Sequence, residues 1–347
     1  MFLSVENIKT LESEKYISEE DFKNNFRIYP QKNDILMTRI GDIGTTNIVK
    51  DNAPKAYYVS LALIKAYSIN PKYLNIAISS EFVQQGLKTR ALLTAIPMKI
   101  NKDQIGLVDV KYPIDNKEQE KIGQLFKDID NLITLHQRKC DKLVNIKKSL
   151  LEKMFPKNGN NVPEIRFKGF TEAWEQRKLG DDLINVQTGT SLLGTENGKG
   201  IPLIKMGNIQ HGYFDLSKLE YLEEDIKVEN YAIARYGDFL FNTRNTLELV
   251  GKSATWIVKT GLYAFNGNIA RFIFKDLNTI FFNYLYNTDN VMKQVHARAT
   301  GTTSVAAIYP KNLNSIEYYL PSKIEQEKIG ELFLKIDNLI TLHQHNP

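Results

Sequence analysis

Cysteine is almost missing from this sequence. One residue, Cys140, stands among 347, so an intramolecular disulfide framework and a cysteine-rich zinc site are both excluded. This composition is typical of a reducing compartment, and we expect a cytoplasmic protein. Cys140 itself we interpret as a small, buried apolar residue.

Long apolar runs are also missing. No stretch approaches the roughly 18 residues that a spanning helix needs, and the opening MFLSVENIKTLESEK places acidic residues where a secretory signal would be basic and then apolar. We expect no membrane partner. The chain is 42% apolar and 24% charged, and its length permits two hydrophobic cores.

The sequence lacks the common catalytic motifs. It has no phosphate-binding GxxxxGK[ST] loop, no HExxH, no CxxC pair and no glycine fingerprint between a strand and a helix. The string NPKY at 70–73 lacks the second proline of the NPP[FY] tetrapeptide expected in an adenine methyltransferase. Asp34 and Asp238 have the chemistry of a Mg²⁺-dependent nuclease, but each precedes a predicted strand, where a turn favours aspartate. We predict no catalytic residue, no metal site, no cofactor in this chain and no small-molecule substrate.

An excess of charge of one sign is absent too. The sequence has 45 Lys and Arg against 40 Asp and Glu, a formal charge of +5. This balance is compatible with a nucleic-acid partner but does not require one.

What the sequence does contain is a repeat. Residues 118–137 read EQEKIGQLFKDIDNLITLHQ and residues 325–344 read EQEKIGELFLKIDNLITLHQ, identical at 17 of 20 positions across a separation of 207. Agreement of this extent divides the chain into two successive units of similar plan. We expect both units to do the same thing at two places on one partner.

Each copy of the repeat predicts a long helix. Apolar positions follow one another at alternating steps of four and three, the seam of a coiled coil. Asp115 or Asn116 can cap the first helix and Pro156 ends it, which gives a rod of roughly 55 Å. We expect the two seams to pair as an antiparallel coiled coil. Their predicted pairing residues are Ile122, Phe126, Ile129, Ile133 and His136 in the first copy and Ile329, Phe333, Ile336, Ile340 and His343 in the second.

Short aromatic or β-branched runs between turn residues predict strands in the second unit. They are 237–244, 253–259, 262–274 and 315–321, and a helix is predicted at 278–297. The domains we predict are a first globular unit at 1–115, a long helix at 116–155, a linker at 156–173, a second globular unit at 174–321 and a second, shorter helix at 322–347.

The first globular unit repeats this plan with little identity. The run 33–39 takes the place of 237–244, Ser60 falls at Asn266, and Met1 falls near residue 202. The stretch 170–200 therefore has no counterpart before Met1, and the second helix lacks the half that would match 139–154. We expect a first domain that is incomplete at its N-terminus and a shortened last helix. A shortened gene, recombination within a variable locus and an upstream segment supplied by another chain are the three explanations that stay open.

The order of these elements resembles the specificity subunit of type I restriction-modification systems. The resemblance rests on the doubled helix that ends in DNLITLHQ and on the phrase PEIRFKGFTEAWEQRKLGD at 163–181, similar to the opening of that family's target recognition domains. The string ATGTTS at 299–304 is similar to the family's Gly-Ser-Thr stretch. Together these motifs cover nearly the whole chain.

This resemblance implies an α+β protein with two α/β target recognition domains, each followed by a long helix. Each domain would read one half of a bipartite sequence in double-stranded DNA, and the paired helices would hold the halves apart. Two modification subunits, which carry S-adenosylmethionine and methylate adenine, would dock on the helices, and restriction subunits would join later. The chain itself would perform no chemistry.

Base reading needs Arg or Lys for guanine and Asn or Gln for adenine on loops that reach a groove. The candidates near predicted strand ends or glycine turns are Arg39, Arg90, Lys205, Asn242, Arg244, Lys252, Arg271 and Arg298, with Thr302 and Thr303 as candidate phosphate contacts. For each basic residue, a phosphate contact or a solvated charge is the competing interpretation, and for the two threonines it is a plain turn. A polar seam position is favoured over a metal ligand for the two histidines.

Two other functions stay open at this point. One is a self-contained DNA-processing enzyme with unrecognised metal carboxylates, for which magnesium-dependent cleavage or methyl transfer by the purified chain would be the sign. The other is a coiled-coil assembly protein that binds no nucleic acid, for which failure to bind DNA at low salt would be the sign.

Overall fold

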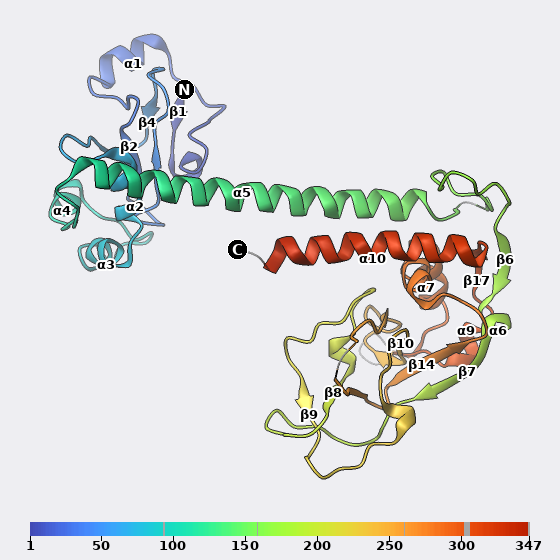
Figure 1. The fold of residues 1–347 in the computed structure, drawn as a ribbon. Helices are drawn as coiled ribbons and strands as arrows, with labels where there is room; N and C mark the ends of the chain where they lie inside the picture. The colour runs from blue at the N-terminus through green and yellow to red at the C-terminus, as the bar shows by residue number, and fades with distance from the viewer. Residues whose placement is uncertain (93, 158, 260, 302–305, 346–347) are drawn as a thin grey trace. The chain divides into compact units, whose positions relative to one another are not determined.

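The computed structural model describes residues 1–92, 94–157, 159–259, 261–301 and 306–345. Its contacts divide the chain into two compact units, Met1–His136 and Gln137–Pro347. Helices and strands occur together in both units, and a long helix follows each sheet domain, as the α+β fold class predicted (Figure 1). Among the described residues, no helix combines the length and apolarity needed to cross a membrane.

The first unit is built on a three-stranded antiparallel sheet in the order β3-β2-β5. Ile35 and Met37 of β2 pack on one side with residues of α2 and α3, and Leu36 packs on the other side. The elements are β1 (Phe2–Leu3), α1 (Glu19–Asn25), β2 (Ile35–Thr38), β3 (Thr46–Ile48), β4 (Ala56–Tyr57), β5 (Leu61–Ile64), α2 (Pro71–Ile78), α3 (Glu81–Thr89), α4 (Lys102–Gly106) and the start of α5 (Asn116–Lys153).

The second unit is built on a four-stranded antiparallel sheet in the order β12-β10-β14-β7. Aromatic side chains of β10, β14 and α7 fill its main core. The elements are β6 (Glu175–Lys178), α6 (Leu179–Asp182), β7 (Leu183–Thr188), β8 (Pro202–Ile204), β9 (Glu220–Tyr221), β10 (Phe239–Asn242), β11 (Arg244–Asn245), β12 (Ser253–Thr255), β13 (Ala264–Phe265), β14 (Ile269–Phe274), α7 (Thr279–Tyr286), α8 (Asp289–His296), β15 (Thr300–Gly301), β16 (Ala306–Ala307), α9 (Pro310–Leu313), β17 (Glu317–Leu320) and α10 (Lys323–His345).

The two units share a frame, as the weak repeat predicted. Strand β2 lies between β3 and β5 as β10 lies between β12 and β14. Strand β1 pairs in parallel with β4, Phe2 opposite Ala56, just as Leu203 of β8 pairs with Ala264 of β13. Met1 therefore corresponds to Pro202, as predicted from the sequence.

One predicted correspondence was wrong by two residues. The backbone N–H of Arg39 donates to the Ser60 carbonyl (2.9 Å), and the equivalent bond in the second unit runs from Thr243 to the Asn268 carbonyl (3.0 Å). Ser60 thus matches Asn268 and not Asn266. The ladder hydrogen bonds of β2 and β10 set this register, and sequence spacing across unequal loops does not reveal it.

The predicted helix at 278–297 is also wrong, because it is two helices. Helix α7 ends at Tyr286, and Thr288 has an extended backbone (ψ 151°) as the N-cap residue of α8. The side chain of Asn278 begins α7 by accepting the N–H of Phe281 (2.9 Å). Apolar periodicity continues through the break, but Thr288 is a residue type that favours helix starts.

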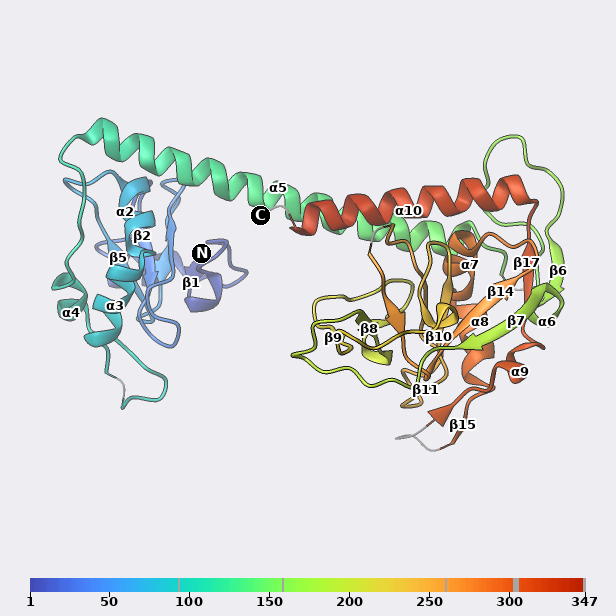
Figure 2. The ribbon, with the colours of Figure 1, turned by 60° about the horizontal axis from the view of Figure 1, so that its bottom comes forward.

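Helix α5 confirms the predicted rod. It runs over 38 residues without interruption, and the carboxylate of Asp115 accepts the N–H of Lys117 (2.9 Å) at its start. Its last turns belong to the second unit and lie antiparallel beside α10 (Figures 1 and 2). Lys147 pairs with Asp337 (2.5 Å), while Phe155, just after the helix, lies 5.9 Å from the Phe333 ring. Cys140 is buried there, as predicted.

A glutamine joins each long helix to its own domain. In the first unit, the side-chain oxygen of Gln119 accepts the backbone N–H of Asn70 (2.7 Å), and its amide donates to the Pro113 carbonyl (2.7 Å). In the second unit, Gln326 makes the same two bonds to Asn278 (3.0 Å) and Pro321 (2.9 Å). We call this arrangement the glutamine joint. It fixes the start of α2 or α7 against the first turn of the long helix.

A glycine one turn later lets the helices approach closely. A Cβ at Gly123 would lie 2.7 Å from Cβ of Lys72 and 2.9 Å from the Tyr73 nitrogen. At Gly330 it would lie 3.0 Å from the Phe281 nitrogen. Glycine is the residue that permits this backbone approach in both copies.

Candidate nucleic-acid interface

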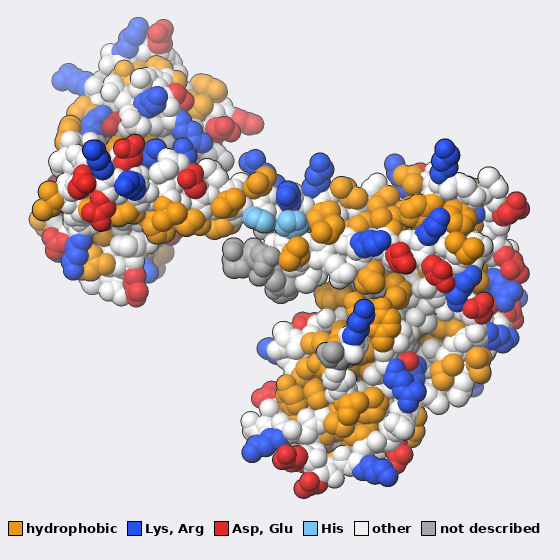
Figure 3. Space-filling model, viewed as in Figure 1, with side chains coloured by type: hydrophobic (Ala, Val, Ile, Leu, Met, Phe, Trp, Pro, Cys, Tyr) orange, Lys and Arg blue, Asp and Glu red, His pale blue; other side chains and the backbone are white. Residues whose placement is uncertain are grey.

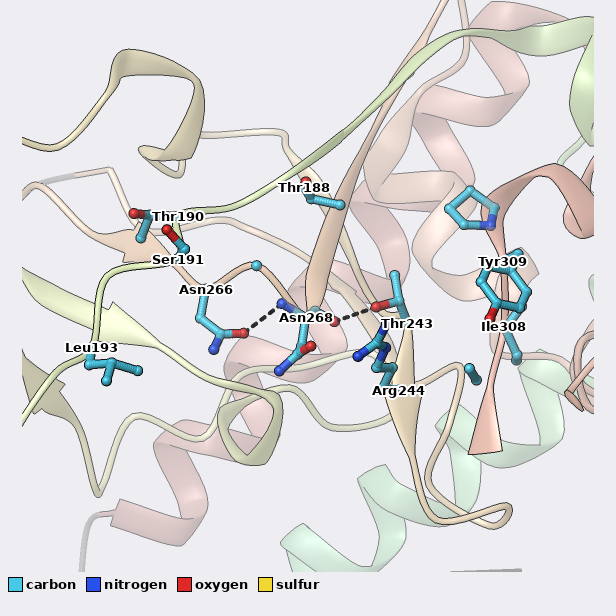
Figure 4. A pocket seen from close by; sticks show the side chains of 13 residues that line it. Thr188, Thr190, Ser191, Leu193, Thr243, Arg244, Asn266, Asn268, Ile308 and Tyr309 are labelled. Carbon is cyan, nitrogen blue, oxygen red and sulfur yellow. Dashed lines mark hydrogen bonds between the residues drawn. The ribbon is translucent and has the colours of Figure 1, made fainter. Parts of the chain in front are cut away.

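The strand ends of the second unit line an open pocket of about 520 Å³, whose surface is mainly apolar. Its lining includes Arg244 of β11, and Figure 2 draws β11 on the side of the unit away from α10. Hydroxyl and amide side chains from four separate segments line it (Figure 4). The lining residues are Thr188, Thr190, Ser191, Leu193, Thr243, Arg244, Asn266, Gly267, Asn268, Ala307, Ile308, Tyr309 and Pro310.

A tight Asn-Gly-Asn turn between β13 and β14 forms the pocket's floor. The side-chain oxygen of Asn266 accepts the N–H of Asn268 (2.9 Å), and the N–H of Gly267 donates to the Thr190 carbonyl (2.7 Å). The chain after β7 comes so close that a Cβ at Gly189 would lie 2.0 Å from the Phe265 carbonyl oxygen. The turn is therefore held rigidly on both sides.

Thr243 connects this turn to a second strand end. Its hydroxyl donates to the Asn268 carbonyl (2.8 Å), and its own carbonyl accepts the N–H of Ile308 (2.9 Å). Figure 4 shows Asn266, Asn268 and Thr243 in a row, with Arg244 beside Thr243. Backbone and side-chain bonds thus place an arginine next to two side-chain amides.

Arg244 is the exposed cation of this pocket. Among the residues that the structure describes, no carboxylate pairs with its guanidinium, and the side-chain amide of Asn268 makes no hydrogen bond. An arginine can donate two bonds to guanine N7 and O6, and an asparagine can bond adenine N6 and N7. Hydroxyls and backbone N–H groups suit phosphates. The pocket therefore offers the groups that reading a base edge requires.

The first unit presents an arginine at the same strand end. Arg39 follows β2, its carbonyl accepts the N–H of Ile100 (2.9 Å), and it corresponds by these bonds to Thr243, one residue before Arg244. Its guanidinium Nε donates to the Val59 carbonyl (2.7 Å), while Tyr58 and Val59 are exposed beside it. Both units thus carry an arginine where the central strand leaves the sheet.

Two other predicted residues lie inside the second unit. Arg271 is 6% exposed, and its guanidinium donates to Asp238 (2.7 Å), Gln187 and the carbonyls of Tyr231 and Ile233. Asn242 is fully buried and donates to the Met206 carbonyl (2.9 Å). A base contact by either side chain would require these internal bonds to break.

The remaining basic candidates make surface contacts within the protein. Lys205 pairs with Glu220 (2.5 Å), and Lys252 donates to Gln210 (2.6 Å). Arg298 donates to Ser315 and to the Gln294 carbonyl at the end of α8, and Arg90 donates to the Gly86 carbonyl (3.4 Å) at the end of α3. These four do not gather around the pocket. Thr302 and Thr303 lie outside the described residues.

One histidine near Lys252 adds little positive charge. Burial first, and the Lys252 ammonium second, lower the pKa of His211. An imidazole with a lowered pKa is mainly neutral at pH 7. His211 therefore adds no appreciable positive charge beside Lys252.

Sequence reasoning missed the amide and hydroxyl lining of the pocket. Asn266 and Asn268 stand in the string FNGN, a tight-turn signal, and Thr190 and Ser191 follow a glycine. That signal identifies a turn. It does not show that the turn meets the end of β10.

The two aspartates considered for a nuclease site hold turns, as the structural interpretation predicted. Asp34 accepts the N–H of Gln31 (2.9 Å) and pairs with Lys65 (2.7 Å). Asp238 accepts the N–H of Arg235 (2.8 Å) and pairs with Arg271. Within the described ranges, no three His, Cys, Asp or Glu side chains group as metal ligands would.

The predicted helix-pairing residues lie in two different environments. In the second copy, Ile329, Phe333 and Ile336 are buried, and Ile340 and His343 are half-buried. In the first copy, Phe126, Ile129 and Ile133 are exposed, while Ile122 and His136 are half-buried. Figure 3 shows hydrophobic side chains on the visible surface of α5. Pairing through the first-copy residues stays a prediction.

Comparison with known proteins points in one direction. The family model described as type I restriction modification DNA specificity domain matches residues 3–145 and 171–347. A type I restriction enzyme specificity subunit, MjaVIII, from Methanocaldococcus jannaschii is 26% identical over 269 residues, 74% of this chain and 61% of that protein. A putative second one from that organism, MjaX, is 30% identical over 187 residues, 52% of this chain and 43% of that protein.

The chain thus spans less than two thirds of the length of either of these curated relatives. A crystal structure of the type I restriction-modification system S subunit from M. genitalium has a similar fold. It aligns with a TM-score of 0.60 at 12% identity and covers 96% of this chain and 88% of that one.

Proposed function

The chain belongs to the type I restriction-modification DNA specificity family, and from this premise we propose that it selects the DNA sequence on which such a system acts. Each unit would read one half of a bipartite target in double-stranded DNA. Helices α5 and α10 would hold the two readers at a set spacing and dock two modification subunits, which supply S-adenosylmethionine chemistry; restriction subunits would join that complex in the cytoplasm. The chain itself would be non-catalytic.

One observation carries the reading role. In both units the central strand ends in the same hydrogen-bonded frame, and an arginine follows it, as the first residue after β2 (Arg39) or the second after β10 (Arg244), while the loops around it differ. A common frame with different loops suits two readers of different half-sites. Phosphate contacts would set the position of each unit on DNA, and the few side chains at the pocket would discriminate bases.

Substitution of the pocket arginine tests this function. The complex of the chain with its modification subunits is used to methylate host DNA, and mapping of methylated adenines defines the target. We expect Arg244→Ala to weaken binding to that target by about tenfold, because a bidentate base contact contributes about 1–3 kcal/mol. Arg235→Ala removes another exposed charge in the same unit and serves as the matched control.

The two arginines also separate the half-sites. Arg244→Ala should relax one half of the mapped sequence and Arg39→Ala the other. Methylation that is unchanged in both variants, or that changes in both halves with either variant, would contradict the proposal of one reader per unit.

A further inference from the structure

The two copies of the Glu-Gln pair that opens each repeated helix differ in one ion pair. Glu325 is fully buried, and its two carboxylate oxygens accept hydrogen bonds from Nε (2.7 Å) and a terminal nitrogen (2.8 Å) of Arg166. This hydrogen bonding is the main cause that raises the pKa of Arg166. Glu118 is the same residue in the first copy. It is exposed, and among the described residues no cation pairs with it.

The strand just before each long helix differs in the same way. In the second unit, β17 (317–320) pairs antiparallel with β6 (175–178), Leu320 opposite Glu175. The matching residues of the first unit, 109–112, form no strand. Tyr112 is 46% exposed and Ile114 is 97% exposed. The first unit therefore has no partner strand along this segment. The Lys111 carbonyl accepts the Tyr73 hydroxyl (2.8 Å), and a docked strand would pair with the other backbone groups.

Both missing partners belong to one segment in the second unit. Residues 163–178, which we call the arm, contain Arg166, strand β6 and Trp174 between them. Trp174 is 2% exposed and packs edge-on against the rings of Phe155 (6.1 Å) and Phe281 (5.9 Å). The arm thus attaches by a charge pair, a buried aromatic ring and a strand.

We propose that the face formed by residues 109–118 of the first unit is a docking site for an arm-like segment. The docked segment has the chemistry of residues 163–178: an arginine that binds Glu118, and a strand, about ten residues further on, that pairs with residues 109–112. Strand addition supplies affinity through the backbone, and the arginine supplies specificity through a bidentate bond to the carboxylate.

The arm of this chain is not that partner. Arg166 and β6 are both committed to the second unit, so a second copy of the chain would have to unfold part of its own second unit to supply them. An arm-like segment that is not already packed on a second unit meets no such cost. The inference uses no DNA contact and stands apart from the proposed function.

A peptide supplies the test. A fluorescently labelled peptide of residues 160–179 is titrated with the full chain, and binding is followed by anisotropy. We expect saturable binding to one site per chain. Glu118→Gln in the chain should weaken it by tenfold or more, because the guanidinium then faces a neutral amide. Glu120→Gln, which changes an exposed glutamate in the same turn, is the matched control and should leave it unchanged.

The partner residue is identified by a double-mutant cycle. Arg166→Gln in the peptide should weaken binding to the unaltered chain as much as Glu118→Gln does, and the two changes together should cost little more than either alone. Hydrogen exchange should show slower amide exchange at residues 109–112 when the peptide is bound.

Three outcomes would overturn the proposal. They are an absence of saturable binding, binding that Glu118→Gln does not weaken, and binding that Glu325→Gln weakens instead, which would show exchange at the second unit. Since none of these readouts involves DNA, each leaves the reading role of the pocket unaffected.

Discussion

The repeated helical block has nearly one sequence but two environments. Phe333 is fully buried against the rings of Tyr284 (4.8 Å) and Phe155 (5.9 Å), whereas Phe126, its counterpart, is 43% exposed. Ile336 is 7% exposed and Ile129 is 40% exposed. The apolar stripe is therefore a property of the sequence, but its burial depends on what lies opposite. In the second unit the end of α5 and helix α7 lie opposite.

Replacement of the two phenylalanines by alanine should give the largest difference in stability between the two copies of the repeated block. We expect Phe333→Ala to lower the free energy of unfolding of the second unit by about 3–5 kcal/mol, because it empties a filled core position. Phe126→Ala should cost less than about 1 kcal/mol. Urea unfolding followed by tryptophan fluorescence measures the first, since both tryptophans, Trp174 and Trp256, belong to the second unit. Hydrogen exchange in the first half of α5 measures the effect of Phe126→Ala. Equal losses of stability in the two variants would contradict the comparison.

A smaller difference is expected for the two glutamates. Glu325→Gln should destabilise the second unit by about 2–4 kcal/mol, because the Arg166 guanidinium keeps its charge but loses a buried carboxylate. Glu118→Gln should change stability by less than about 0.5 kcal/mol. The same unfolding measurement reports the first variant, and the exchange measurement reports the second. Similar effects of both substitutions would show that Glu118 has a partner in the isolated chain.

The smallest difference should occur where the environments match. Gln119→Ala and Gln326→Ala each break a glutamine joint and leave a helix-start N–H and a proline carbonyl without their bonds. We expect either substitution to lower the free energy of unfolding of its own unit by about 1–3 kcal/mol. Exchange rates at the start of α2 and of α7 would reveal the loosened joint. A clear inequality between the two variants would mean that the joints are alike in geometry but not in energy.

Much of this fold was predictable from local signals. The bounds of α5 follow from a seam sustained over many turns, an Asp at one end and Pro156 at the other, and each of these acts within a few residues. The break between α7 and α8 was missed because the apolar pattern continues across Thr288. The match of Ser60 to Asn268, and not to Asn266, was missed because hydrogen bonds between strands distant in the sequence set this register.

The candidate site was less predictable for a physical reason. Arg244 begins β11 and Arg271 is the third residue of β14, and the sequence predicted both as candidates of the same kind. One is exposed at a pocket, while the other is buried under Asp238 and two loop carbonyls. Which arginine faces outward depends on the alternation of β14 against β10 and on the loop that covers it, so the residue type alone does not decide.

The glutamine joint and its glycine have a consequence for how such chains change over time. The joint consists of a cap asparagine, a proline carbonyl and a few residues of the repeated block, and it is present in both units. An exchange of genetic material between the two copies of that block would leave every one of these bonds intact. A different domain joined to the helix at this block would keep the joint by which the present domain attaches.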